Sequence, residues 1–267
     1  MPTTKTTTSK PKLTPRQQQI LHLIYRYRFI TRPQLQALFE HKDKKQIGLW
    51  LKQLREQEYI GWIYSDHFTE KTKPAIYYLD TPGIGFLRTV GNMPPGQLRT
   101  RYRDKARSDS FVARCLLIAD CCADLMMQSL VDTTHPSHVE ADYRDPESKY
   151  HFLAKLGPHL VFTKTKDNST QPYLLSVIDS TLPRYRVRKL LKNYVEFLDS
   201  GEWTDEIDGP SPIALFICPT KADMIYVKRR TRKLLEDIMS EGEIHIRFAV
   251  ANQIKVHGVT GKIWEEA

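Results

Sequence analysis

Lysine, glutamine and arginine side chains gather on one predicted helix, residues 43–58. Apolar residues of this segment recur at helical spacing and account for a buried face. The polar residues that remain on it are Lys44, Lys45, Gln46, Gly48, Lys52 and Arg55. Lysine and arginine suit phosphate oxygens, and glutamine suits the edge of a base. The pattern therefore predicts a helix that can lie in a DNA groove, and a solvated basic surface is the alternative.

Gly48 stands in the interior of that predicted helix. A glycine there costs about 1 kcal/mol of helix stability relative to alanine, yet it would let the backbone approach DNA closely. Further basic residues are expected on a turn, on an arm between domains and on a later helix. They are His67, Lys71, Lys73, Arg101, Arg103, Arg186 and Lys189. Each could contact a phosphate, and each could equally belong to a solvated surface.

Cysteine and histidine residues do not combine into a convincing metal site. Cys121 and Cys122 are followed by His135 and His138, which superficially resembles a zinc module. Adjacent residues of a helix point about 100° apart, so these two thiols cannot readily hold one ion. We expect the cysteines to be buried as small apolar residues. Hydrolase elbows, Gly-rich phosphate loops and the His pair of a relaxase are absent from the sequence.

Three helices and two strands are predicted to position the polar residues of 43–58. Thr14 and Pro15 begin the first helix, because a hydroxyl can cap its first turn and proline fits the first helical position. Thr31 begins a second, short helix. Two β-rich runs follow the third helix, at 59–64 and 75–79, and a polar turn joins them. This order is typical of a winged helix-turn-helix, which lays a helix in the DNA major groove.

The rest of the chain alternates between strands and helices. A long apolar helix is predicted at 108–130, strands at 159–164, 173–179, 213–218 and 244–250, and helices at 183–198 and 221–239. This order predicts an α/β layer with a partly parallel sheet. We therefore expect a disordered basic tail at 1–12, a winged helix-turn-helix domain at 13–90, a basic linker at 91–107 and an α/β domain at 108–267.

The composition indicates a globular protein with an anionic partner. Forty Lys and Arg residues against 31 Asp and Glu residues give a formal net charge of +9. Four cysteines without a disulfide-type spacing favour a reducing compartment. No signal-peptide-like apolar stretch follows Met1, and no run of about 18 apolar residues could span a bilayer. We expect a cytoplasmic protein with no membrane partner.

Several segments resemble the replication-relaxation family of bacterial plasmids and mobile elements. The clearest are LTPRQQQILHLIYRYRFITRPQLQALF, LKQLREQEYI and IYYLDTPG. The likeness continues loosely through PHLVFTKTKDNSTQPYLLSVIDSTLPRYRVRKLLKNYVEFL and IALFICPTKADMIYVKRRTRKLLEDI. It implies an α+β winged helix-turn-helix followed by an α/β restriction-endonuclease-like domain with a mixed sheet.

The resemblance also raises the question of a Mg²⁺-dependent nuclease site. Such folds hold the metal with an Asp at the start of one strand and an acidic residue on the next. The first of these positions falls at Pro158 and His159 in this chain, and the second falls near Val177. Asp179 remains as a weak metal candidate, with lysines on the following helix. A single carboxylate is a poor Mg²⁺ site, so we expect a non-catalytic domain in which Asp179 is a capping or turn residue.

Together these features predict a sequence-selective protein that binds double-stranded DNA of a mobile element, in plasmid replication, transfer or transcription control. A homodimer would pair two half-sites. One alternative is a metal-dependent DNA endonuclease with a rearranged active site, for example among the acidic residues of 140–147. Another is an adaptor that docks on a relaxase or a replication protein. No cofactor is expected, apart from Mg²⁺ in the nuclease alternative.

Overall fold

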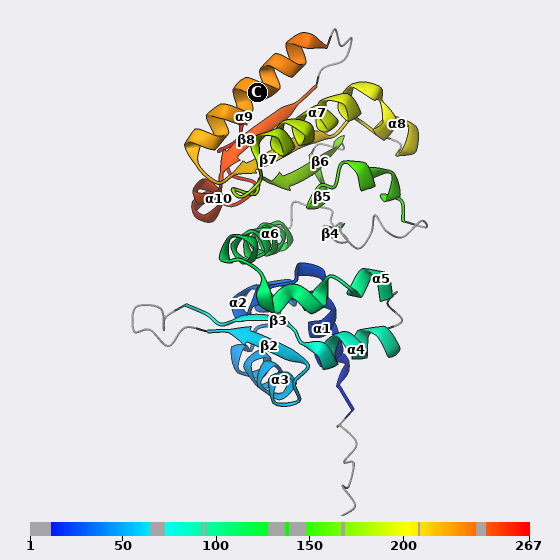
Figure 1. Cartoon of the computed structure of the whole chain (residues 1–267), viewed down its shortest axis with the longest axis vertical. Helices are drawn as coiled ribbons and strands as arrows, with labels where there is room; N and C mark the ends of the chain where they lie inside the picture. The colour runs from blue at the N-terminus through cyan, green and yellow to red at the C-terminus, as the bar shows by residue number, and fades with distance from the viewer. Residues whose placement is uncertain are drawn as a thin grey trace, which may run out of the picture. The chain divides into compact units, whose positions relative to one another are not determined.

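A computed structural model describes residues 12–64, 73–91, 93, 95–127, 137–138, 148–166, 169–207, 209–238 and 244–267. The chain divides into two compact units, of which the first comprises residues 1–36 and 41–106 and the second comprises residues 37–40 and 107–267. Each unit contains its own sheet (Figure 1).

The first unit combines helices with a three-stranded antiparallel sheet in the order β1-β3-β2. Its elements are α1 (Pro15–Tyr27), β1 (Ile30–Thr31), α2 (Arg32–Leu38), α3 (Lys44–Glu56), β2 (Ile60–Ile63), β3 (Ile76–Leu79), α4 (Thr81–Thr89), α5 (Pro95–Leu98) and the 3₁₀ helix η1 (Arg101–Ala106). The predicted succession of three helices and two strands is confirmed. The sequence did not indicate β1, because two residues are too short to show an alternation.

Local capping explains where α1 begins. The Thr14 hydroxyl accepts a hydrogen bond from the Gln17 amide, and the Gln17 side chain accepts one from the Thr14 amide at 2.9 Å. This reciprocal pair satisfies two amides that the helix itself leaves without a partner. The apolar face of α1 is then buried through Ile20, Leu21 and Ile24. The predicted start at this hydroxyl and proline is confirmed.

Residues 101–106, predicted as part of a linker, are packed into the first unit. The buried guanidinium of Arg28 forms an ion pair with the buried carboxylate of Asp104. Arg101 is only 3% exposed, donates from Nε to the Tyr25 carbonyl at 3.1 Å and lies over the Tyr25 ring. The prediction that Arg101 contacts DNA is therefore wrong, because its side chain is used to fasten η1 to α1.

The second unit is built on a six-stranded mixed sheet in the order β4-β5-β6-β7-β8-β9. Its elements are α6 (Asp109–Met127), β4 (Ser137–His138), η3 (His151–Lys155), β5 (Leu160–Lys166), β6 (Ser169–Val177), α7 (Arg184–Ser200), α8 (Glu202–Glu206), β7 (Ile213–Cys218), α9 (Lys221–Asp237), β8 (Ile246–Val250), α10 (Ala251–His257) and β9 (Glu265–Glu266). Strands β6, β7 and β8 are parallel, and the other pairings are antiparallel. The predicted α/β layer with a partly parallel sheet is confirmed.

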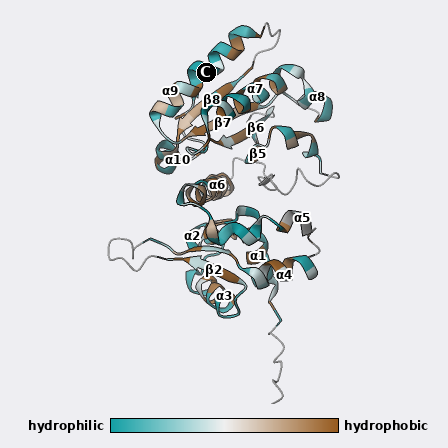
Figure 2. Ribbon diagram, viewed as in Figure 1, coloured by the Kyte–Doolittle hydropathy of each residue, from teal (hydrophilic) through white to brown (hydrophobic). Residues whose placement is uncertain are grey.

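Helices α7 and α9 cover one face of this sheet. Each connects neighbouring parallel strands in the same direction across the sheet, and crossovers of one hand then place both helices on the same face. Tyr194 of α7, Phe216 of β7 and Phe248 of β8 meet in the resulting core. The buried Tyr194 hydroxyl hydrogen bonds the Ser176 hydroxyl at 2.6 Å. Strands β7 and β8 are correspondingly hydrophobic in Figure 2.

Helix α6 carries three of the four cysteines and lies apart from α7 and α9 (Figure 1). All four cysteines are buried, as predicted, and none of them forms a disulfide. Burial, followed by the charge of Asp223, raises the pKa of Cys218 to about 12. The Asp124 carboxylate of α6 accepts a hydrogen bond from the Val259 amide at 2.6 Å, which fastens the helix to the segment after α10. Among the described residues, no helix is long and apolar enough to cross a membrane.

Candidate functional site

Helix α3 packs against the rest of the first unit through one apolar face. Ile47, Leu51 and Leu54 are buried on that face. At the start of the helix, the Asp43 carboxylate accepts hydrogen bonds from the backbone amides of Lys45 and Gln46, at 2.8 and 3.3 Å. The cap fixes the first turn, so the opposite face of the helix is presented to solvent in a defined orientation.

Three lysines neighbour Gly48 on the surface of α3, and Arg55 lies in the last turn of the helix. Lys44, Gly48 and Lys52 are spaced four residues apart and lie in a row along the helix, while Lys45 and Arg55 flank that row. We call Lys44, Lys45, Lys52 and Arg55 the α3 cation cluster. A Cβ atom built on Gly48 would meet no atom within 4 Å. No packing contact therefore requires a glycine here, and the gap between the cations is open.

The three lysines of the α3 cation cluster are not arranged for helix stability. Lys44 and Lys45 occupy the first turn, where the helix dipole disfavours positive charge by about 0.3–1 kcal/mol per residue, and the turn contains no acidic residue. Lys52 lies 3.7 Å from Glu56, but both side chains are more than half exposed, so this ion pair contributes little. The charges of the three lysines are thus unexplained by folding and are available to an anion, whereas Arg55 lies in the last turn, where the helix dipole favours a cation.

Leu49 also lies on the exposed part of α3, and sequence reasoning missed it. Its side chain is 47% exposed. Leu49 follows Lys45 by four residues, so the helical spacing that identified the cations could have identified it too. An apolar side chain on such a surface can contact the methyl group of thymine.

The strands next to α3 contribute an aromatic surface. The Arg55 guanidinium lies 4.0 Å from the centre of the Trp62 ring on β2. On β3, Tyr77 is directly opposite Trp62. Burial raises the pKa of Tyr77, whereas the positive charges of Arg55 and Arg32 oppose the increase. This surface is therefore electropositive next to the C-terminal end of α3.

The other predicted DNA contacts are dispersed. Lys73 is exposed before β3, Arg103 is exposed on η1, and Arg186 and Lys189 are exposed on α7 of the second unit. The predicted contacts His67 and Lys71 lie outside the described residues. The same is true of His135 and of the acidic residues in 140–147.

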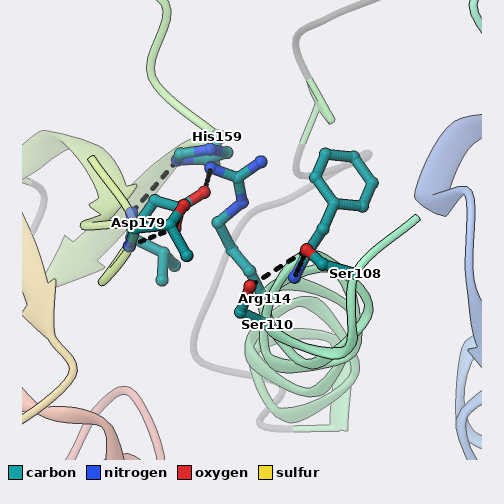
Figure 3. Close-up of polar contacts among 8 residues, drawn as sticks. Ser108, Ser110, Arg114, His159 and Asp179 are labelled. Carbon is teal, nitrogen blue, oxygen red and sulfur yellow. Dashed lines mark hydrogen bonds and ion pairs between the residues drawn. The ribbon is translucent and has the colours of Figure 1, made fainter. Parts of the chain in front are cut away.

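Asp179, the weak metal candidate, lies just after β6 and is surrounded by hydrogen-bond donors (Figure 3). Its Oδ2 atom accepts from Arg114 Nη1 of α6 at 2.7 Å. Its Oδ1 atom accepts from the amide and the hydroxyl of Thr181, at 2.9 and 2.6 Å. His159 directly precedes β5, the strand next to β6, and its Nδ1 atom accepts a hydrogen bond from the Val177 amide at 3.1 Å. The structure thus brings together the positions near His159, Val177 and Asp179 that the sequence selected.

The residues at Asp179 do not fit a Mg²⁺ ion. Burial would raise the pKa of Asp179, but the Thr181 hydrogen bonds and the charges of Arg114 and His159 together lower it. Both carboxylate oxygens accept hydrogen bonds, and a cation would have to displace the guanidinium of Arg114. Among the described residues, no three His, Cys, Asp or Glu side chains gather into a metal-binding group. The predicted role of Asp179 as a turn residue is supported by its bonds to Thr181.

Comparison with known proteins places the chain in a family. Similar solved structures include the restriction endonuclease FokI, which is 11% identical with a TM-score of 0.32 over 91% of this chain and 44% of that chain. They also include FokI bound to DNA, at 11% identity with a TM-score of 0.26 over 93% and 45%. This chain therefore spans less than half the length of those structures. No curated protein matches significantly. The model of the replication-relaxation family matches residues 21–207, more than two thirds of the chain, and the chain belongs to this family.

Proposed function

We propose that the protein binds double-stranded DNA with sequence selectivity and that its first unit is a winged helix-turn-helix. The observation that carries this proposal is the α3 cation cluster around Gly48. Lys44 and Lys45 oppose the helix dipole in the first turn, and Gly48 lowers helix propensity without any packing need. Both features are explained if a phosphate of the DNA backbone seats against the helix between the cations.

The elements around α3 support this proposal. Helix α2 precedes α3 after a short connection, and β2 and β3 follow it as an antiparallel pair. A helix-turn-helix that enters a major groove reads bases with the residues on its exposed face. Gln46 and Leu49 are suited to that role, because an amide can pair with adenine and an apolar group can contact thymine. Lys73 would touch the backbone beside the groove.

Membership of the replication-relaxation family supports a role in plasmid replication, transfer or transcription control in the cytoplasm. The second unit would be a restriction-endonuclease-like domain without catalysis, serving as a platform for DNA or for a replication protein or relaxase. Arg186 and Lys189 are exposed for such a contact. A homodimer would pair two half-sites on the DNA.

The proposal is tested by measuring duplex affinity over a range of salt concentrations. Sequences are first selected from random duplex DNA with the full chain. Lys44→Ala, Lys45→Ala and Lys52→Ala should each weaken binding and reduce the slope of log affinity against log salt by about 1, as expected for one lost phosphate contact. Arg16→Ala is the matched control, since Arg16 is an exposed cation in the first turn of α1.

Unchanged affinity and slope in all three α3 variants would overturn the proposal. Equal effects of Arg16→Ala and Lys45→Ala would also count against it, because net charge alone would then explain binding. The nuclease alternative is tested with supercoiled DNA and Mg²⁺ or Mn²⁺. Metal-dependent nicking that disappears in Asp179→Ala would favour that alternative.

A further inference from the structure

An exposed stack of three flat groups lies beside α3. The rings of Trp62 and Tyr64 are 5.2 Å apart and nearly parallel, with an interplanar angle of 8°. The Arg55 guanidinium lies over the Trp62 ring at 4.0 Å. We call Arg55, Trp62 and Tyr64 the aromatic stack. Trp62 is 42% exposed and Tyr64 is 43% exposed, so two large rings remain in contact with water.

The fold explains why these rings share a face. Residues two apart in a strand point to the same side of a sheet, so Ile60 and Trp62 lie on one side of β2 and Gly61 and Ile63 on the other. Tyr64, the residue directly after β2, stacks on Trp62. On the other side of β2, the Tyr78 ring packs against Gly61, where a Cβ atom would lie 2.4 Å from that ring. Buried Ile60 anchors the near side. The two rings beyond it extend past the packed core.

The charges around the aromatic stack limit the ligand that it could take. Arg55 already contributes a positive charge, and Arg32 acts on the adjacent Tyr77 as well. A cationic ligand would be repelled here, whereas a flat ligand that carries negative charge would be attracted. A nucleotide combines these two properties. Bases within a duplex are stacked on both sides, so only an unpaired base offers a free face.

We propose that the aromatic stack binds an unpaired nucleobase of DNA, next to the duplex that α3 contacts. This inference rests on the proposed function, because it places a single-stranded segment beside a DNA duplex. Stacking of a base on an aromatic side chain is tolerant of sequence. The first unit would then recognise a junction between double-stranded and single-stranded DNA, such as a partly melted site.

The test compares three fluorescent DNAs with the full chain: a blunt duplex, the same duplex with a single-stranded extension, and the single strand alone. The extended duplex should bind about tenfold more tightly than the blunt one. Tyr64→Ala should remove most of this advantage without changing blunt-duplex affinity. Trp62→Ala should remove it too, with a smaller loss on the blunt duplex because it also takes away the ring under Arg55. Ile63→Ala is the matched control, since Ile63 is equally exposed at 42% but lies on the other side of β2. Trp62→Leu keeps an apolar side chain but should behave like Trp62→Ala.

A second readout is the fluorescence of 2-aminopurine at the first unpaired position, which should be quenched by the wild type and by Ile63→Ala only. The inference would be overturned if the wild type bound the extended duplex no more tightly than the blunt one. It would also be overturned if Trp62→Ala and Tyr64→Ala kept the full preference of the wild type for the extended duplex. Binding of the extended and single-stranded DNAs without binding of the blunt duplex would overturn the proposed function instead and leave the aromatic stack as a single-strand site.

Discussion

Replacing Gly48 with alanine separates the stability of α3 from its interaction with DNA. Gly48 is in the helix interior, and the added Cβ atom would meet nothing within 4 Å. The substitution therefore brings only the gain in helix propensity, about 1 kcal/mol, without a clash. A methyl group in the gap between Lys44 and Lys52 would, however, keep a phosphate from its closest approach. We expect Gly48→Ala to be more stable than the wild type and to bind duplex DNA about tenfold more weakly.

Stability is best followed by hydrogen exchange of the α3 amides in the full chain. An increase of about 1 kcal/mol should slow their exchange by roughly fivefold where they open with the unit. Gly85→Ala in α4 is the matched control, because a Cβ atom at Gly85 also meets nothing within 4 Å. It should raise stability similarly and leave DNA affinity unchanged. Gly83→Ala should be destabilising, since its Cβ atom would lie 2.1 Å from the Tyr59 carbonyl oxygen.

Two results would refute this reasoning in different ways. A Gly48→Ala protein that is less stable than the wild type would show that the space beside the helix is not open. A protein that is more stable and retains wild-type affinity would show that DNA does not use the gap. In the second case, alanine at position 48 would raise helix stability at no cost in DNA affinity, and the proposed interface would not explain the glycine.

Three further predictions concern structural residues. In denaturant titrations, Arg101→Ala should lower the free energy of unfolding by about 1–3 kcal/mol, because it removes the hydrogen bond from Arg101 to the Tyr25 carbonyl. Arg103→Ala, on the exposed side of η1, should change the free energy of unfolding by less than about 0.5 kcal/mol. Asp179→Asn should destabilise the protein at neutral pH by about 1–2 kcal/mol. Because folding lowers the pKa of Asp179, this contribution is present above its ordinary value of 3.8 and is lost as the pH falls through the lowered value, so wild type and variant should converge in acid. Cys218 and the other buried thiols should not react with a thiol reagent until the protein is unfolded, and rapid native-state reaction would contradict their burial.

Elements with a strong local signal could be predicted from the sequence. A hydroxyl followed by proline marked the start of α1, and a continuous apolar run identified β7, with its bounds at Ile213 and Cys218. Such signals depend on residues a few positions apart. Segments shaped by distant contacts could not be predicted in this way. The residues of η1 were predicted as a basic linker. Their own composition does not show that the Asp104 carboxylate pairs with Arg28, which lies 76 residues away in the sequence.

The candidate site shows the same division. The cations of α3 follow from helical spacing, and the same spacing places Leu49 one turn after Lys45 on the exposed part of the helix. The stack of Arg55 on Trp62 joins a helix to a strand and needs the tertiary fold. Arg114 gave no signal at all, because it lies 65 residues before Asp179 and on an apolar helix.

The two candidate sites differ in whether their charges are already satisfied within the protein. Asp179 has donors on both oxygens, so binding a further cation there would break the ion pair to Arg114 before forming any new contact. Lys44 and Lys45 form no ion pair with the carboxylates of the described residues, and the space beside Gly48, which neighbours them on the helix, is open. An anion would therefore gain contacts at α3 without displacing any. Reactivation of Asp179 as a metal ligand would require at least the loss of Arg114 and a second carboxylate near His159 or Val177, whereas the surface of α3 needs no rearrangement to accept a phosphate.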